Sequence, residues 1–303
     1  NVTSEPTFFI FAFSTSENQR LIILTVVVLV YLVTLGGNLL IIALICLEPL
    51  LHTPMYFFLC NLSTLDILYV STTLPKLIYV CHTGDHVMSY VSCMVQLYFS
   101  AISGITECYL MTAMAIDRYV AICFPLHYSL IMSKKVCVLL AVPAWFVSMV
   151  NAIILPCLIH NLKYVNLVFV KSFYCELKTI MNASASDNTF LKTTLTIAMI
   201  YVGAIPSCMI LASYVRIIYT ILKIKSSAGR WKTFSSCSSH LTIVVLCFGC
   251  GMSYYLSQSH EKEIFLSFMF VTLVPMFNPL VFSLRNRDIT QAIRRRIDWT
   301  ITS

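Results

Sequence analysis

Long runs of apolar residues recur along the chain, and each is long enough to cross a membrane as a helix. Five runs contain no Asp, Glu, Lys or Arg, and two contain a single acid, Asp66 in one and Glu107 in the other; the runs are 21–47, 53–75, 87–116, 136–159, 193–215, 233–259 and 264–284. A helix needs about 20 predominantly apolar residues to cross the hydrocarbon core. Strands of a membrane barrel would alternate apolar and polar residues, and these runs do not. We therefore expect seven transmembrane helices.

The turns that flank these runs extend the expected helices to about 21–47, 53–80, 87–122, 136–159, 190–223, 232–259 and 262–285. The rest of the chain forms two tails and six loops, of which the longest is 160–192. None of these segments has room for a soluble catalytic domain. The fold class that we predict is an all-α membrane protein, a seven-transmembrane helix bundle that occupies 1–303 as a single domain.

The composition agrees with a membrane protein and excludes several soluble classes. Hydrophobic residues make up 58% of the chain and charged residues 11%, whereas soluble domains carry about 25% charged residues. The mean hydropathy is +0.84. A water-soluble enzyme, a disordered protein and a nucleic-acid binder are thereby disfavoured. A membrane enzyme would need a catalytic set such as clustered His or Ser/His/Asp, and none converges here, so we expect no enzymatic activity.

The basic residues are distributed unevenly between the two sides of the expected bundle. Thirteen of the 20 Lys and Arg residues fall in the segments 117–135, 216–232 and 285–303, which follow spans three, five and seven. Basic residues are enriched in cytoplasmic loops, which places the N-terminus outside and the C-terminus in the cytoplasm. The net charge of +7 therefore arises from basic residues on the cytoplasmic side, where they form a surface for membrane lipids and a partner protein. It does not imply a nucleic-acid partner.

Four strongly polar side chains occur at mid-depth or deeper in the spans: Asn38, Asp66, Glu107 and Asn278. Ionised groups within a bilayer are costly and usually functional. Two neighbouring carboxylates such as Asp66 and Glu107 would share a proton or hold a cation such as Na⁺. The alternative is a hydrogen-bonded network that only fixes helix packing.

Most of the cysteines lie within the spans, but Cys93 and Cys175 fall on the outer, oxidising side. A disulfide between them would pin the long outer loop over the mouth of the bundle, and the strand-like segment 164–170 suits such a lid. Glycosylation sequons begin at Asn1 and Asn182 on the same side. No group of cysteines and histidines has the spacing of a zinc site, so we expect no metal centre of that kind.

Several motifs occur in an order typical of one receptor family. Span three ends in MAIDRYVAICFPLHY (114–128), whose Asp-Arg pair resembles the rhodopsin-like G-protein-coupled receptors. The wider set resembles the olfactory (odorant) receptors: PMYFFL at 54–59, LSTLDILY at 62–69, KTFSSCSSHL at 232–241 and PMFNPLVFSLRN at 275–286. Each motif is weak alone, but together with Ser213-Tyr214 at the end of span five the ordered set covers five of the seven spans and is specific.

This resemblance implies roles for individual residues at the cytoplasmic end. Asp117 and Arg118 would form an ion pair that is released on activation, and Arg118 would then repack with Tyr214 and His240 as span six moves. The remaining positions of the coupling motifs are Tyr119, Asn278, Pro279 and Phe282. A short amphipathic helix at about 286–297 would lie on the inner leaflet with Arg294, Arg295 and Arg296 at the lipid headgroups.

The chain departs from the family pattern at a few positions. Ile116 and Phe282 each replace a tyrosine, and Phe282 thereby lacks a hydroxyl that the family's activation network would use. The second disulfide of the outer loop, usual in the family, is missing because Ala185 stands where the partner of Cys157 is expected. We therefore expect Cys157 to be a thiol.

The resemblance also implies an odorant site between the outer halves of spans three, five, six and seven. Tyr255 is the expected polar anchor, and no lining position carries a charge, so a small neutral ligand is expected. The predicted lining comprises Ser100, Ala101, Gly104, Ile105, Cys108, Met199, Val202, Gly251, Met252, Tyr255, Phe268 and Val271.

Taken together, the motifs indicate an odorant receptor in the plasma membrane, in olfactory cilia by family resemblance. A small, mostly apolar odorant would activate a heterotrimeric G protein of the stimulatory, olfactory type and raise cyclic AMP. Two alternatives stay open: a non-olfactory rhodopsin-like receptor for a peptide or lipid, and a membrane transporter or channel. A transporter would show internal repeats and broken helices, and the sequence has no such repeat.

Overall fold

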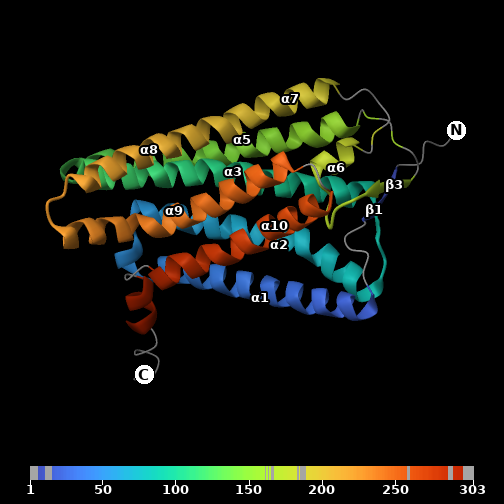
Figure 1. The fold of residues 1–303 in the computed structure, drawn as a ribbon, viewed down its shortest axis with the longest axis horizontal. Helices are drawn as coiled ribbons and strands as arrows, with labels where there is room; N and C mark the ends of the chain where they lie inside the picture. The colour runs from blue at the N-terminus through green and yellow to red at the C-terminus, as the bar shows by residue number, and fades with distance from the viewer. Residues whose placement is uncertain are drawn as a thin grey trace.

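The structure, a computed structural model, describes residues 6–10, 16–160, 162, 164, 167–182, 184, 189–257, 260–285 and 289–295. Within this part of the chain, seven helical stretches are long and apolar enough to cross a membrane, which confirms the predicted bundle (Figure 1). They are α1 (Glu17–Leu47), α2 (Pro54–Thr83), α3 (Tyr90–Cys123), α5 (Lys134–His160), the stretch formed by α7 (Thr189–Met199), η3 (Ile200–Ala204) and α8 (Ile205–Leu222), α9 (Ser227–Leu256) and α10 (His260–Arg285).

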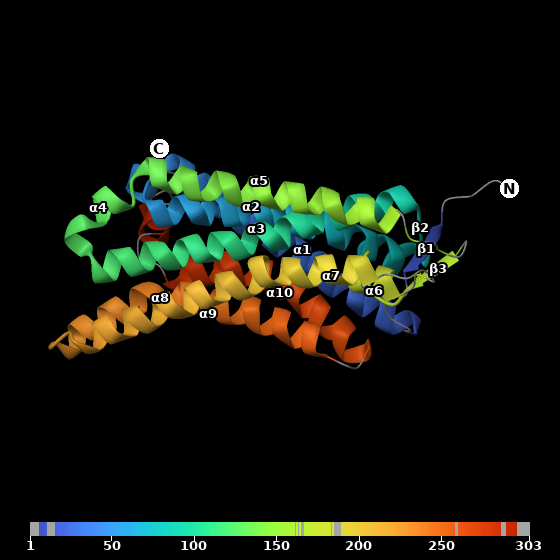
Figure 2. The ribbon, with the colours of Figure 1, turned by 90° about the horizontal axis from the view of Figure 1, so that it is seen from above.

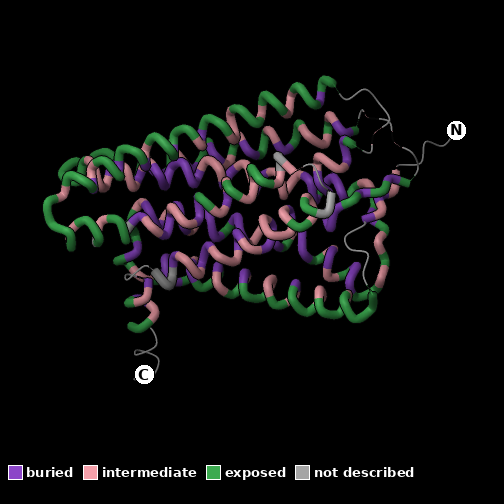
Figure 3. The backbone as a smooth tube through the Cα atoms, viewed as in Figure 1, coloured by how far each residue is buried: buried purple, intermediate pink, exposed green. Residues whose placement is uncertain are grey.

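Helix α3 is the central element of the bundle, because it packs against α2, α5, α8 and α9. Buried residues are concentrated along α2 and α3, whereas α1, α7 and α8 present long exposed faces (Figure 3). Those faces carry apolar side chains such as Leu32, Phe190 and Leu211. Lipid tails are as apolar as leucine side chains, so these residues need no protein partner in a bilayer.

Two helix ends differ from the sequence prediction. Span three was expected from residue 87, but Val87–Met88 forms strand β2 and α3 begins at Tyr90, where the Ser89 hydroxyl accepts from Ser92 N–H at 3.2 Å. Span six was expected at 232–259, but α9 runs from Ser227 to Leu256. Apolarity marks where a helix crosses the membrane, whereas the local capping bonds decide where the helix begins.

The fifth span is interrupted by a π-helical turn at Ile200–Ala204, directly before Pro206. Proline has no N–H to donate and its ring obstructs the preceding turn. A π turn accommodates this by widening the helix, and such turns are frequent at functional sites. The widened turn changes which residues of span five face the bundle.

The outer end of the bundle carries a three-stranded sheet in the order β2-β1-β3. The central strand β1 (Thr7–Ile10) pairs antiparallel with β2 and parallel with β3 (Leu167–Val170), which confirms the strand expected within 164–170. Cys93 and Cys175 form the expected disulfide. Cys157 is a thiol, as expected. Of the expected glycosylation sites, Asn182 is exposed at the end of α6 (Leu177–Asn182). Asn1 and Ala185 lie outside the described residues. The long outer loop and the N-terminal strand thus form one lid.

The opposite end of the bundle carries short connecting helices. These are η1 (Pro49–Leu51), η2 (Pro125–His127) and α4 (Tyr128–Ile131), together with the α8–α9 connection. Residues 289–295 are helical, with Ile289 and Ala292 buried and Arg294 and Arg295 exposed; Arg296 lies outside the described residues. This confirms an amphipathic helix after span seven. Strand β1 and this last helix lie at opposite ends of the bundle, and α4 and α6 mark the same two ends (Figures 1 and 2).

Candidate functional site

A buried amide–carboxylate pair joins α2 to α10 at mid-membrane. Asn278 Nδ2 donates to both carboxylate oxygens of Asp66, at 3.0 and 2.9 Å. Both side chains are buried. Hydrogen bonds to an ionised group are stronger than neutral ones and shape where the partner helix sits. The contact joins two of the four polar residues expected at mid-depth.

The other two polar residues extend this region without touching that pair directly. Asn38 Nδ2 donates to the carbonyl oxygens of Thr34 and Pro275, at 3.0 and 3.2 Å, and so ties α1 to α10. Glu107 on α3 forms a side-chain hydrogen bond with Cys247 on α9. Three buried oxygens have no hydrogen-bond partner: Asn38 Oδ1, Glu107 Oε1 and Asn278 Oδ1. The region therefore contains unsatisfied acceptors.

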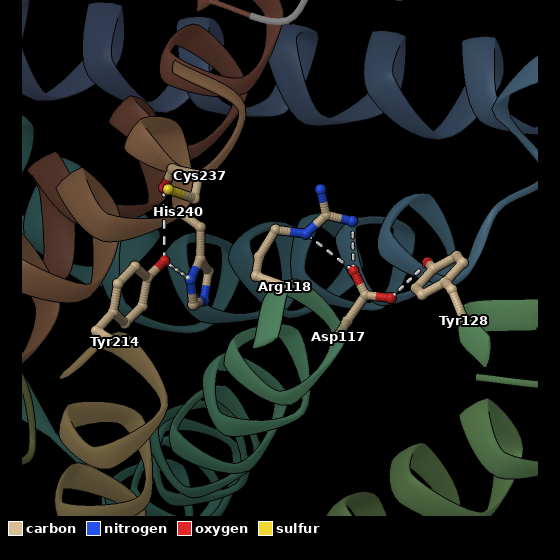
Figure 4. A network of polar contacts seen from close by, with 6 residues as sticks. All are labelled: Asp117, Arg118, Tyr128, Tyr214, Cys237 and His240. Atoms are coloured by element: carbon tan, nitrogen blue, oxygen red, sulfur yellow. Dashed lines mark hydrogen bonds and ion pairs between the residues drawn. The ribbon is translucent and has the colours of Figure 1, made fainter. Parts of the chain in front are cut away.

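At the cytoplasmic end of α3, Asp117 is held from two sides. Arg118 Nε donates to Asp117 Oδ2 at 3.0 Å, and the Tyr128 hydroxyl donates to Oδ1 at 2.7 Å (Figure 4). Asp117 is fully buried and its side chain forms the expected ion pair with Arg118. Burial, together with the Asp117 charge, raises the pKa of Tyr128, which keeps its hydroxyl a neutral donor. These contacts around Asp117, called the Asp117 lock below, thus include α4 as well as α3.

A separate set of contacts holds span six to spans three and five. His240 is buried, its Nε2 lies 3.1 Å from the Met111 carbonyl oxygen, and its Nδ1 lies 2.6 Å from the Tyr214 hydroxyl (Figure 4). A carbonyl can only accept, so Nε2 carries the proton and Nδ1 accepts from Tyr214. In Figure 4 the Arg118 guanidinium points toward Asp117 and away from His240. The predicted repacking of Arg118 with Tyr214 and His240 would therefore need a second conformation.

The remaining coupling residues have packing roles. Phe282 is fully buried and belongs to an apolar core cluster to which spans one to six also contribute. Pro279 approaches Gly37 so closely that a Cβ there would lie 3.0 Å from the proline ring, which explains why α1 carries a glycine at this crossing. The Tyr119 ring packs on Phe124 at 5.7 Å, apart from the His240 contacts.

The expected ligand residues on span three lie together on a half-buried face. Ser100, Ala101, Gly104, Ile105 and Cys108 all have intermediate exposure. A Cβ placed on Gly104 would meet nothing within 4 Å, and the same holds for Gly251 on span six. The Ser100 hydroxyl donates to the Leu97 carbonyl oxygen at 3.0 Å. The face thus borders open space, with the serine hydroxyl engaged by its own helix.

Some other expected ligand residues face elsewhere, and these expectations were wrong. Met199 and Met252 are 46% and 59% exposed. Met252 follows Val245, also exposed, by two helical turns, so both lie on the outward face of α9. The widened π turn begins immediately after Met199 and shifts the helix phase there. Val271 is fully buried against spans one and two.

The structure leaves three expected ligand residues half-buried or undescribed. Val202 lies within the π turn, at intermediate exposure. The Phe268 ring contacts Phe173 of the outer loop at 5.6 Å. The side chain of Tyr255, the expected anchor, lies outside the described residues, although its backbone is helical.

Sequence reasoning missed several polar and exposed residues beside these sites. The Tyr201 hydroxyl hydrogen-bonds Asn151, and the Tyr109 hydroxyl donates to the Tyr201 carbonyl oxygen at 3.4 Å, which joins α3, α5 and the π turn. Leu126 is 90% exposed beside the Asp117 lock. Leu126 stands within the mostly apolar segment 124–132, so the sequence offered no contrast that singled it out.

The comparisons with known proteins agree on one family. A family model described as olfactory receptor matches residues 27–298. Human olfactory receptor 1M1 is 39% identical over 312 residues, covering 100% of this chain and 98% of that protein. Rat olfactory receptor 1 is 41% identical over 269 residues, covering 88% of this chain and 86% of that protein. The crystal structure of squid rhodopsin aligns with a TM-score of 0.76 at 17% identity, over 96% of this chain and 84% of that chain.

The contacts of His240 generate a first prediction. Tyr214→Phe removes the hydroxyl that donates to His240 Nδ1 and leaves a buried acceptor unsatisfied, at a cost of about 1–3 kcal/mol. We expect a lower midpoint of thermal unfolding for the purified protein. The matched control is Tyr219→Phe, on the same helix, because Tyr219 is exposed. Equal midpoints for the two variants would show that this hydrogen bond does not stabilise the observed state.

Proposed function

The chain belongs to the olfactory receptor family, and from that premise we propose that it detects a small, mostly apolar, neutral odorant and activates a stimulatory, olfactory-type G protein. It is a multi-pass membrane protein, and the proposed location is the plasma membrane of olfactory cilia. The observation that supports signalling best is the pair of separate buried contacts at the cytoplasmic end, one around Asp117 and one around His240. The family match decides against both alternatives that the sequence left open.

The proposed ligand site is the half-buried face of span three together with span six. Open space beside Gly104 and Gly251 leaves room for a ligand between these helices. The expected lining carries no Asp, Glu, Lys or Arg. A charged ligand would lose its hydration there without gaining a counter-charge. A neutral molecule with one hydrogen-bonding group therefore suits the site best.

The proposed coupling step is a movement of α9 away from α3. The His240–Met111 contact is a direct hydrogen bond between these two helices near the cytoplasm. An odorant that favours the open state would shift the population toward it. The opened cleft would expose Arg118 to a G-protein helix, and the exposed Leu126 would offer an apolar contact beside it. Raised cyclic AMP would follow from a stimulatory G protein.

We also propose that Asp66 and Glu107 share a proton or hold Na⁺ in the resting state. The residues present fit such an ion, because the orphaned Glu107 Oε1 and Asn278 Oδ1 and the Asp66 carboxylate supply oxygen atoms, which hard cations prefer. A bound positive charge would offset the repulsion between the two carboxylates. The chain's own contribution is to hold α2, α3 and α10 around this point.

The coupling proposal predicts the behaviour of Arg118→Ala. This change should abolish odorant-stimulated cyclic AMP while surface expression stays near the wild-type level, because Arg118 would contact the G protein only in the open state. Arg216→Ala, an exposed arginine at the end of α8, is the control and should retain most signalling. Normal cyclic AMP production by Arg118→Ala would refute the role proposed for Arg118.

The ligand proposal predicts that Gly104→Leu blocks odorant responses, whatever the polarity of the ligand, by filling the open space with a side chain. The control is Gly36→Leu, since Gly36 also has nothing within 4 Å but lies on the exposed face of α1. Both variants should reach the cell surface, and the assay is cyclic AMP against an odorant panel. Intact responses in Gly104→Leu, or a best agonist that is a charged amine or amino acid, would contradict the proposed site.

The ion proposal predicts a sodium effect on stability. Sodium at about ten times its dissociation constant should stabilise the resting receptor by about 1.4 kcal/mol, seen as a higher unfolding midpoint in NaCl than in choline chloride. Glu107→Gln and Asp66→Asn should each remove the difference, while Asp85→Asn in the exposed outer loop should keep it. If the wild type responds to pH but not to sodium, the pair shares a proton. If neither the salt nor pH distinguishes Glu107→Gln from the wild type, the two acids are not coupled.

A further inference from the structure

The long outer loop is fastened to the centre of the bundle around Cys175. The disulfide to Cys93 joins the loop to α3. The Cys175 backbone N–H donates to Gln96 Oε1 at 2.7 Å, and Gln96 Nε2 donates to the Thr72 carbonyl oxygen on α2 at 2.9 Å. Gln96 is itself buried, and its amide oxygen contacts the loop while its amide nitrogen contacts α2. The loop therefore has a fixed point above spans two and three.

The residues just before this point enter the bundle as an aromatic plug. Phe173 is fully buried in a cluster with Leu74, Leu77 and Val271. Its ring meets Phe268 of α10 edge-on at 5.6 Å. The plug thus closes the space between α2 and α10 by apolar packing.

The residues just after the fixed point reach across to spans six and seven through one lysine. Lys178 Nζ lies 2.7 Å from Glu263 Oε1 at the outer end of α10. The same ammonium lies over the Tyr254 ring of α9, 5.3 Å from its centroid. A single side chain of the loop therefore contacts the outer ends of both helices. It does so close to Gly251 and Phe268, which belong to the proposed ligand site on the same helices.

This contact is stronger than an ordinary surface ion pair. The side chains of Lys178 and Glu263 are 32% and 17% exposed, so both groups are largely shielded from water. Exposed pairs contribute little because water screens them, whereas shielded pairs and cation–aromatic contacts are screened less. A second carboxylate, Glu176, is buried nearby, and burial raises its pKa to about 7 while Lys178 opposes the shift. A hydrogen bond with Ser172 also opposes this shift in the pKa of Glu176.

We propose that Lys178 is a gate residue: its contacts with Glu263 and Tyr254 must open before a ligand can pass between the extracellular side and the outer half of the bundle. This inference rests on the ligand site of the proposed function. It assigns to Lys178 control over the rates at which a ligand enters and leaves the bundle. Recognition of the ligand is left to the residues of the ligand site, deeper in the bundle. A purely structural strut would stabilise the lid without limiting those rates.

The gate is tested by the rate at which a thiol in the ligand space is modified from outside. Gly104→Cys places the thiol where the structure has open space. The full-length receptor in cells is exposed to two membrane-impermeant methanethiosulfonates of similar size, the cationic trimethylammonium-ethyl and the anionic sulfonato-ethyl reagent. Labelling of the receptor without Gly104→Cys is subtracted, which removes the contribution of the native thiols.

Lys178→Met and Glu263→Gln should each accelerate labelling by both reagents at least fivefold. Lys171→Met is the matched control, because Lys171 is an exposed lysine of the same loop and its loss changes the net charge equally. The double variant Lys178→Glu/Glu263→Lys, which swaps the two charges, should bring the labelling rate back toward the wild-type value. If Lys178→Met accelerates labelling by one reagent and slows labelling by the other, Lys178 acts only by attracting or repelling the charged reagents. That result would show that the gate proposal is wrong.

The same experiment separates the gate from the proposed function, because labelling needs neither an odorant nor a G protein. Equal labelling rates in all backgrounds, or no labelling in any, would overturn the gate even if odorants raise cyclic AMP. Accelerated labelling in Lys178→Met and Glu263→Gln supports the gate even if no odorant on the panel activates the receptor. In that second case the proposed function would fail while the route into the bundle stands.

Discussion

The hydrogen bonds from Asn278 to both oxygens of Asp66 are the contact on which the arrangement of the spans depends. In the hydrocarbon core no water is available to hydrogen-bond a buried carboxylate, so the carboxylate must be paired within the protein. The pairing sets α2 against α10, and Asn38 adds α1 through the Pro275 carbonyl oxygen. Because Pro275 and Asn278 are a turn apart on one helix, spans one, two and seven form a unit with one rigid polar seam.

A second set of polar contacts joins spans three, five and six to one another. Glu107 reaches α9 through a thiol, and a thiol is a weak hydrogen-bond donor. At the cytoplasmic end α9 depends on His240, whose two ring nitrogens are both engaged. The bundle thus contains one seam built on an amide–carboxylate pair and a second set of contacts built on a thiol and an imidazole.

The sequence was sufficient for the seven spans, because apolar length is a direct consequence of the bilayer. It was insufficient for side-chain direction around irregular backbone. Met199 was assigned to the ligand site, but the π turn that follows it alters the helix phase. The contacts of Tyr128 with Asp117 and of Lys178 with Glu263 were also missed, since these two residues lie in short helices of the connecting segments, whose path no periodicity describes. Contacts made by these connecting segments depend on tertiary structure, which a periodic pattern along the sequence does not specify.

One stripe of α9 links the three polar regions of the molecule. His240, Cys247 and Tyr254 are seven residues apart, which is close to two helical turns, so they lie on one face of the helix. This face meets Met111 and Tyr214 at the cytoplasmic end, Glu107 at mid-membrane and Lys178 at the outer end. A rotation of α9 as a rigid body therefore changes all three contacts at once. In the proposed mechanism, ligand passage at the lid, charge at the centre and opening at the cytoplasm would need no separate messenger, because the helix itself would connect them.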